Sequence, residues 1–160
     1  MIQKSIEASI IQYVLEFAAQ VKKEGDLQCQ AYGITTQQWL ILLHLANDPN
    51  VPFSMKRAKD QPVLASELAD FFKVSRANIT NLLSVLLNKK LIRQIEDSRD
   101  RRRKFLQLTA EGEKVVNALE PLRNAANERL FSQFLPEEKA LFFEYLQQCV
   151  KYLSTVLQNR

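Results

Sequence analysis

The sequence has little that would support a disulfide scaffold, a membrane span or a metal site. Its 160 residues include only 3 glycines, 2 cysteines and 1 histidine. Two cysteines that fit no metal-binding spacing indicate reduced thiols rather than a disulfide framework. Apolar runs long enough to cross a bilayer are absent, and the N-terminal segment has no small-residue cleavage site. We therefore expect a cytoplasmic protein with no membrane partner.

The scarcity of histidine also argues against an enzyme. His44 lies within an apolar stretch, and no Ser-His-Asp, Cys-His or multi-histidine set accompanies it. We expect His44 to line the core or a pocket wall, with no catalytic residue, no metal and no cofactor. Cys29 and Cys149 have no adjacent cation or histidine that would activate a thiol, so we expect both to be inert.

Positive charge is concentrated in one part of the chain. The net charge is only +4, but the segment from Lys73 to Lys104 holds ten lysines and arginines against three acidic residues, a local excess of +7. From Arg99 to Lys104, five of six side chains are cationic. Such a distribution indicates a localised anionic partner rather than charge spread for solubility.

Amphipathic helices are predicted at both ends of the chain. Apolar residues recur every three or four positions from Ile6 to Val21, which predicts a helix ending near Gly25. Two further helices are predicted after Thr109 and from Pro136. Their apolar stripes exceed what one small domain can cover. We therefore predict a homodimer whose helical dimerisation region consists of residues 1–34 and 113–160.

The middle of the chain, residues 35–112, predicts a winged helix-turn-helix. Thr35 can cap a helix and Gln38 can reach back to it, and the residues that follow are apolar nearly all round. A proline-containing loop at 48–61 precedes two short helical patterns separated by a tight break before Ser75. The period then changes to two in residues 91–96 and 102–108, which predicts a β-hairpin wing. The fold is thus mainly α with a small hairpin.

The second short helix has the pattern of a recognition helix. Its apolar residues face inward, while small and amide side chains lie on the exposed side of its first two turns. Arginine can pair with guanine, asparagine with adenine, and alanine or threonine with a thymine methyl group. The predicted double-stranded DNA contacts on this helix are Ser75, Arg76, Ala77, Asn78, Thr80 and Asn81. Ser66 is a weaker candidate for phosphate binding.

The hairpin tip is narrow enough to enter a minor groove, whose potential is most negative at A·T tracts. Its predicted contacts are Arg99, Arg101, Arg102 and Arg103, although a solvated strand explains Arg103 equally well. We expect Asp97 and Asp100 to brace the turn through ion pairs and Asx hydrogen bonds.

In combination these segments resemble the MarR family of bacterial winged-helix transcription regulators. The resemblance rests on GITTQQWLILLHLA, SELADFFKVSRANITNLLSVLLNKKLI and DSRDRRRKFLQLTAEG, which occur in the family's order and at close to its spacings. It implies one chain, residues 1–160, that forms an obligate dimer with two DNA-binding lobes. It also implies a repressor of a palindromic operator, released by a small-molecule effector or oxidant in many members.

Three departures from the family pattern stand out. Lys73 and Lys90 occupy positions where the family usually has glycine, and a positive φ there would cost about 1 kcal/mol, which favours reshaped turns. Leu64 replaces a usual threonine cap, and the loop at 48–61 is longer than the family norm. Cys29 lies later than the first-helix position of the peroxide-sensing branch, so the resemblance does not extend to redox sensing.

Two alternatives stay open on the residues alone. A winged-helix module for protein interaction or RNA binding would show no preference for an inverted repeat in DNA. A thiol-based redox regulator would show release that depends on a cysteine.

Overall fold

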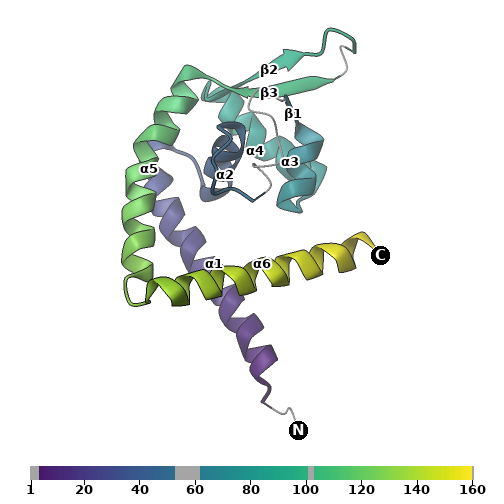
Figure 1. Ribbon diagram of the computed structural model, residues 1–160. Coiled ribbons are helices and arrows are strands. Elements are labelled where there is room, and N and C mark those ends of the chain that lie inside the picture. Colours follow the sequence, from purple (N-terminus) through teal and green to yellow (C-terminus); the bar gives the residue numbers. More distant parts are fainter. Residues whose placement is uncertain (1–3, 53–61, 101–102, 160) are drawn as a thin grey trace. The chain divides into compact units, whose positions relative to one another are not determined.

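The computed structural model describes residues 4–52, 62–100 and 103–159, and it is mainly α with one small sheet (Figure 1). This confirms the predicted fold class. In chain order the elements are α1 (Ile6–Cys29), the 3-10 turn η1 (Gln30–Tyr32), α2 (Thr36–Leu45), β1 (Val63–Leu64), α3 (Ala65–Phe72), α4 (Arg76–Asn88), β2 (Ile92–Glu96), β3 (Lys104–Leu108), α5 (Ala110–Phe131) and α6 (Pro136–Gln158).

The prediction that the first helix ends near Gly25 is wrong, because α1 continues to Cys29. Glycine serves here as a contact point rather than a helix end. A Cβ atom on Gly25 would lie 2.6 Å from the Thr36 hydroxyl oxygen, so only glycine lets α1 and α2 approach this closely. The Thr36 hydroxyl donates to the Lys22 carbonyl at 2.8 Å, which joins the two helices at the same point.

The start of α2 confirms the predicted capping box. The Thr35 hydroxyl accepts from the Gln38 backbone N–H at 3.3 Å, and the Gln38 side chain accepts from the Thr35 N–H at 2.8 Å. Ile41 and Leu42 on this helix are completely buried. As predicted, α2 is a central helix of the lobe.

The predicted helix-turn-helix is present as α3 and α4. Leu64 has no capping oxygen, but the Glu67 carboxylate accepts from the Leu64 N–H at 2.7 Å and so satisfies one amide at the start of α3. The turns after α3 and α4 are not reshaped: Lys73 has φ of 54° and Lys90 has φ of 58°. Both lysines thus adopt the left-handed conformation in which glycine is the usual residue.

The sheet has one strand more than predicted. Two strands were expected from the period-two pattern, whereas the observed order is β1-β3-β2, with every pairing antiparallel. In β1, Val63 pairs with Leu106; across the hairpin, Ile92 pairs with Leu108 and Glu96 with Lys104. A two-residue strand is too short to show a period.

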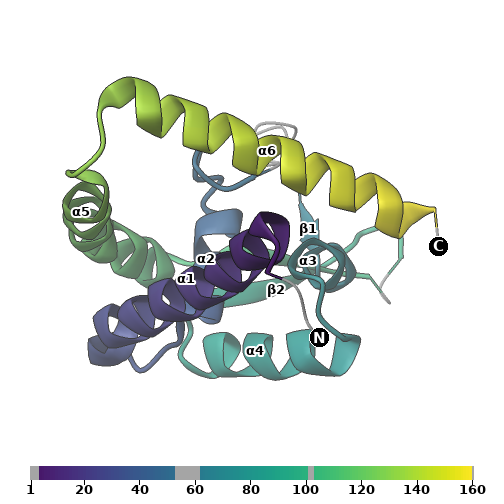
Figure 2. The same cartoon turned by 90° about the horizontal axis from the view of Figure 1, so that it is seen from below.

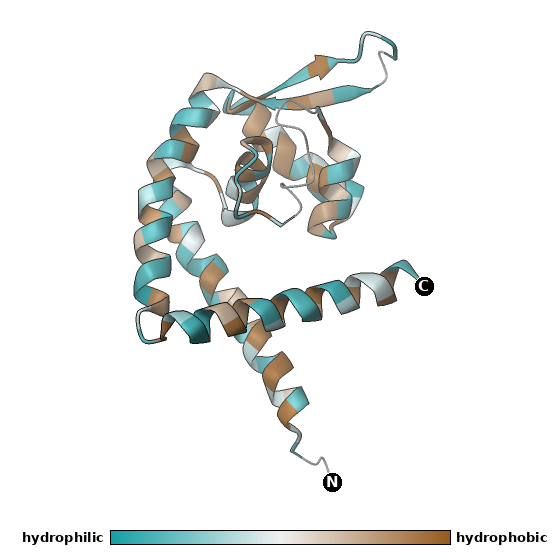
Figure 3. Cartoon of the chain, viewed as in Figure 1, coloured by the Kyte–Doolittle hydropathy of each residue, from teal (hydrophilic) through white to brown (hydrophobic). Residues whose placement is uncertain are grey.

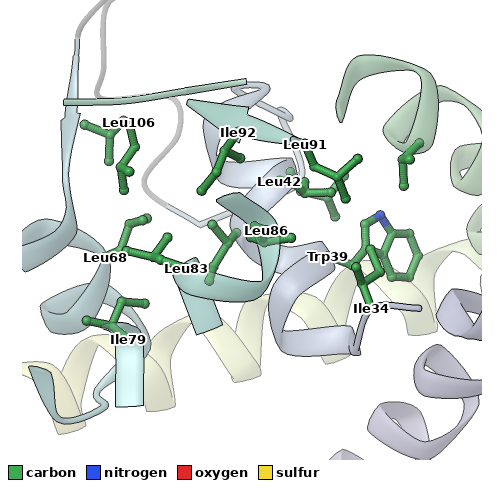
Figure 4. Packing of buried hydrophobic residues seen from close by; sticks show 14 of the residues in the cluster. Ile34, Trp39, Leu42, Leu68, Ile79, Leu83, Leu86, Leu91, Ile92 and Leu106 are labelled. Atoms are coloured by element: carbon green, nitrogen blue, oxygen red, sulfur yellow. The ribbon is translucent and has the colours of Figure 1, made fainter. Parts of the chain in front are cut away.

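The core of the lobe lies between the helices and the sheet (Figure 4). It draws on the helix-turn-helix, on α2 and on both hairpin strands. The labelled residues in Figure 4 are Ile34, Trp39, Leu42, Leu68, Ile79, Leu83, Leu86, Leu91, Ile92 and Leu106. Leu106 is buried as predicted, because alternate residues of a strand point to opposite faces.

Two close contacts join the start of α5 to the segment between α4 and β2. The Thr109 hydroxyl accepts from the Gly112 N–H at 3.1 Å, which caps the helix, and donates to the Lys90 carbonyl at 2.7 Å. A Cβ atom on Gly112 would overlap the Leu91 carbonyl oxygen. Any larger residue at this position would therefore push α5 away from the end of α4.

The chain divides into two compact units, the first ending at Pro121 and the second beginning at Leu122. Pro121 lies inside α5, so the boundary falls within this helix. The second unit contains α6, which starts at Pro136 as predicted. None of the α6 residues is buried. In Figure 3, apolar and polar positions alternate along this helix.

Candidate nucleic-acid interface

The N-terminal half of α4 exposes a polar face above a buried apolar face. Ser75 is the N-cap, and its hydroxyl accepts from the Asn78 N–H at 3.1 Å. The apolar side is fixed in the core by Ile79, Leu83 and Leu86. The predicted contact residues of the first two turns are all exposed, namely Arg76, Ala77, Asn78, Thr80 and Asn81. Local packing thus separates the two faces as the sequence predicted.

The side chains on this face differ in whether they already make hydrogen bonds within the protein. The Thr80 hydroxyl donates to the Arg76 carbonyl at 2.8 Å, so its proton is used within the helix. Within the part of the chain that the structure describes, neither the Asn78 nor the Asn81 side-chain amide is hydrogen-bonded to another residue. These amides have the donor and acceptor capacity that an adenine edge requires.

Helix α3 supports α4 and brings a second polar group to the lobe surface. The two helices pack against each other, and in Figure 2 α3 is seen nearly end-on while α4 lies across the view. Ser66 is exposed in the first turn of α3. It therefore lies on a different helix from the other predicted contacts, at a helix start where backbone N–H groups favour an anion.

The hairpin tip is braced by Asp97, as the sequence predicted. Its carboxylate accepts from the Arg99 N–H at 2.9 Å and lies 3.9 Å from the Arg103 guanidinium. The backbone closes the same turn, because the Asp97 N–H donates to the Arg103 carbonyl at 3.0 Å and the Arg103 N–H donates to the Asp100 carbonyl at 2.9 Å. Arg99 is exposed at this tip.

Arg103 is engaged within the hairpin itself. Besides pairing with Asp97, its guanidinium lies 5.7 Å from the centre of the Phe105 ring, within the range of a cation–π contact. This geometry favours a bracing role for Arg103 over a contact with DNA. Arg101 and Arg102 lie outside the residues that the structure describes.

The structure therefore groups the candidate residues in three places of one compact unit: the exposed face of α4, the start of α3 and the hairpin tip. The hairpin extends beyond the helices of the lobe in Figure 1. Lys73, which the sequence analysis singled out only as a departure from glycine, is exposed two residues before the α4 cap.

Cys29 does not have the properties of a redox sensor. Its side chain is completely buried in the core. Burial, reinforced by the negative charge of Asp26, raises the pKa of the thiol to about 11. Because the thiolate is the reactive form, this environment suppresses oxidation. Cys149 is exposed on α6.

His44 is buried and its ring packs 4.8 Å from the ring of Phe71, which confirms the predicted core position. Across the described ranges, no group of three or more His, Cys, Asp or Glu side chains could hold a metal ion. The same residues include no helix long and apolar enough to span a membrane.

Comparison with known proteins places this arrangement in a family. The model of the MarR family matches residues 32–103, which include α2, the helix-turn-helix and β2 and end just before β3. The HTH-type transcriptional regulator FarR of Neisseria gonorrhoeae is 30% identical over 116 residues, which cover 71% of this chain and 69% of FarR. The chain belongs to the MarR family. The resemblance noted in the sequence is thereby confirmed.

Two further matches cover different shares of the chain. The transcriptional regulator HosA of Escherichia coli is 34% identical over 74 residues, which cover 46% of this chain but only 55% of HosA, so the chain spans about half the length of this relative. The structure of the Staphylococcus aureus MepR–DNA complex has a TM-score of 0.72 and 22% identity, covering 94% of this chain and 99% of MepR. That structural likeness shows the winged-helix fold.

Proposed function

We propose that this MarR-family protein is a sequence-specific transcriptional regulator that binds double-stranded DNA as a homodimer. The observation that carries the proposal is the exposed face of α4, where Arg76, Asn78 and Asn81 project from a helix fixed by buried leucines. A helix of this kind can enter the major groove with its N-terminal turns toward the bases. The related MepR has been solved in complex with DNA.

Each side chain on this face has a matching partner in DNA. Arg76 can donate two hydrogen bonds to guanine, and the amides of Asn78 and Asn81 can each pair with adenine. Ala77 and the Thr80 methyl group suit a thymine methyl group, particularly since the Thr80 hydroxyl already donates within the helix. The helix starts at Ser66 and Ser75 favour phosphates.

The hairpin supplies a second contact in this proposal. Arg99 is exposed at a tip held by Asp97, and the sequence continues with Arg101 and Arg102. A narrow basic tip suits the minor groove, where A·T tracts concentrate negative potential. Arg103 acts here by holding the turn through Asp97.

Exposed apolar stripes support the homodimer. Along α1, the residues Ile6, Ile10, Val14, Phe17 and Val21 are between 38% and 69% exposed. On α6, Leu141, Tyr145, Leu153 and Leu157 recur at multiples of four residues and are all exposed. A second copy of the chain would cover both stripes, and two-fold symmetry would then pair two α4 helices with a palindromic operator.

The proposal also includes a cytoplasmic location and, from the family resemblance, a repressor that a small-molecule effector releases. Selection of bound fragments from random DNA tests the class directly. We expect enrichment of an inverted repeat. Enrichment of no DNA, or of DNA without a repeat, would contradict the proposal and favour a winged-helix module for protein interaction or RNA binding.

The base-reading role of α4 is tested by a matched pair of substitutions. Asn78→Ala removes an amide from the first turn and should cost about 1–3 kcal/mol on the selected site, with relaxed preference at one symmetric pair of positions. Asn88→Ala changes the same residue type at the opposite end of α4, where it is exposed, and should leave affinity unchanged. Equal losses for both variants would contradict the docking by the N-terminal turns.

A further inference from the structure

Two lysines in the lobe adopt an unfavourable backbone conformation. Throughout the described ranges, the non-glycine residues with positive φ are Asn47, Lys73 and Lys90. Asparagine tolerates this region because its short polar side chain can bond locally, whereas lysine has no such compensation. A strained residue of this kind is a starting point for a functional hypothesis.

The two lysines end their helices in the same way. After α3, the Val74 N–H donates to the Ala69 carbonyl at 3.1 Å; after α4, the Leu91 N–H donates to the Leu86 carbonyl at 3.0 Å. In each turn the N–H donor lies five residues after the carbonyl acceptor, as in a Schellman motif. This hydrogen bond requires a left-handed conformation at the residue just before the donor, which is Lys73 or Lys90 and is a position where glycine is favoured. Both turns thus form despite the lysine side chain and not because of it.

The residues that follow Lys73 add positive charge and no negative charge up to the end of α4. Lys73 is exposed, and Ser75 and Arg76 follow at the start of α4. The first turn of α4 contains no acidic residue, and its unpaired N–H groups add partial positive charge. No described carboxylate lies within ion-pairing distance of the Lys73 ammonium group. The cation is therefore not neutralised by the described part of the protein.

Lys90 offers an internal comparison. It lies beyond the other end of α4, a helix of 13 residues, which at 1.5 Å per residue is about 20 Å long. There its carbonyl accepts from the Thr109 hydroxyl at the start of α5. Lys90 shares the exposure and the backbone strain of Lys73, but it is distant from the polar face of α4.

We infer that Lys73 is a phosphate-binding residue that contacts the DNA backbone at the edge of the groove entered by α4, and that Lys90 is not. The inference rests on the proposed DNA-binding function. Residues just before a recognition helix lie beside the phosphates that border the major groove. An ammonium group on a flexible stem suits one phosphate as a point charge. In the complex with DNA, the free energy of this contact between Lys73 and a phosphate would offset the strain of the left-handed turn.

Glycine substitutions separate the backbone effect from the charge effect. Lys73→Gly and Lys90→Gly both relieve a positive φ, so each should raise the melting temperature by roughly 2–4 °C. Only Lys73→Gly should weaken binding to the DNA fragment selected with the parent protein, on the order of tenfold at ~0.1 M salt for the dimer. The slope of log affinity against log salt should fall by about 2, one unit for each subunit.

Two more variants test the charge at constant backbone strain. Lys73→Arg should keep parent-like affinity, whereas Lys73→Gln should bind as weakly as Lys73→Gly while melting at the parent temperature. Equal affinities and salt slopes for Lys73→Gly, Lys90→Gly and the parent would overturn the inference and leave the DNA-binding function standing. A parent protein that selects no DNA would overturn both.

Discussion

The helix-turn-helix lobe and helix α6 use similar apolar content in opposite ways. In the lobe, Ile41, Leu42, Leu68 and Leu86 are completely buried, whereas α6 buries no residue at all. The lobe satisfies its apolar residues within one chain. Helix α6 carries a regular apolar stripe that only another surface can cover.

The same division appears within single helices. Helix α1 is buried only at Gly25 and Cys29, near its C-terminal end, and its apolar residues before that are exposed. Helix α5 buries Val115 and Leu119 before Pro121 but exposes Leu122 after it. The difference teaches that folding and association draw on separate sets of apolar residues, so substitutions should be able to affect one without the other.

The largest expected effect is on association. Leu153→Asp would place a charge in the stripe of α6, where covering it would cost on the order of 5 kcal/mol. Light scattering should then give the 18.5-kDa mass of one chain instead of twice that mass, with little change in the helical signal of circular dichroism.

Lys151→Asp is the matched control, because residues two positions apart in a helix lie on nearly opposite sides and Lys151 is two positions before Leu153. It should remain dimeric. Dissociation by both variants, or by neither, would remove the distinction between the apolar stripe and the rest of α6.

The next effect is on folding of the lobe. Leu86→Ala would leave a cavity in the core and should lower the free energy of unfolding by about 2–5 kcal/mol, measured by urea denaturation. Ser84→Ala, an exposed change on the same helix, should alter it by less than about 0.5 kcal/mol. A loss at Leu86 no larger than at Ser84 would mean that the lobe core does not support the fold.

A smaller, pH-dependent effect is expected where α1 meets α2. The Thr36 N–H donates to the Asp26 carboxylate at 2.7 Å, and with help from Lys22 at 2.9 Å this holds the pKa of Asp26 below its usual range. The resulting stability is present above the unfolded pKa of about 3.9 and is lost as pH falls through the lower folded value.

Asp26→Asn should therefore be less stable than the parent at neutral pH, and the two should converge as the parent loses stability below about pH 4. Thermal melts across that range provide the measurement. Glu24→Gln, on the exposed side of α1, is the control. A constant difference between Asp26→Asn and the parent at every pH would show that the carboxylate charge contributes nothing.

The smallest effect is expected at the thiols. Cys29 is buried in the core with a raised thiol pKa, and Cys149 is exposed on α6. The double variant Cys29→Ala/Cys149→Ser should bind DNA like the parent before and after peroxide treatment. Peroxide-driven release that occurs in the parent and disappears in the double variant would instead establish a redox switch.

Much of the lobe could be predicted because its signals are local. Thr35 and Gln38 form their capping box within three residues, and Ser75 caps α4 over the same span. The apolar period of α4 correctly separated Ile79 and Leu83 from the polar face. Asp97 was recognised as a brace because an Asx turn needs only its own neighbours.

The misses involve residues far apart in the chain. The strand at Val63 and Leu64 exists because β3 pairs with it through Leu106 and Phe105, and a two-residue segment has no pattern of its own. Gly25 lies inside α1 where that helix packs against Thr36, a contact that only the packing of α1 on α2 creates. Without that contact, a glycine at this position predicts a helix end.

By itself, the sequence determined which faces are apolar, where helices are capped and where positive charge collects, because these follow from residue type and spacing. The tertiary structure decided which of those groups are held in contacts within the protein and which backbone conformations they adopt. It placed Arg103 beside Asp97 and Phe105, and it required a left-handed conformation of Lys73. The physical reason is that such pairings and backbone strains arise only when a turn is closed by elements that pack on both sides of it.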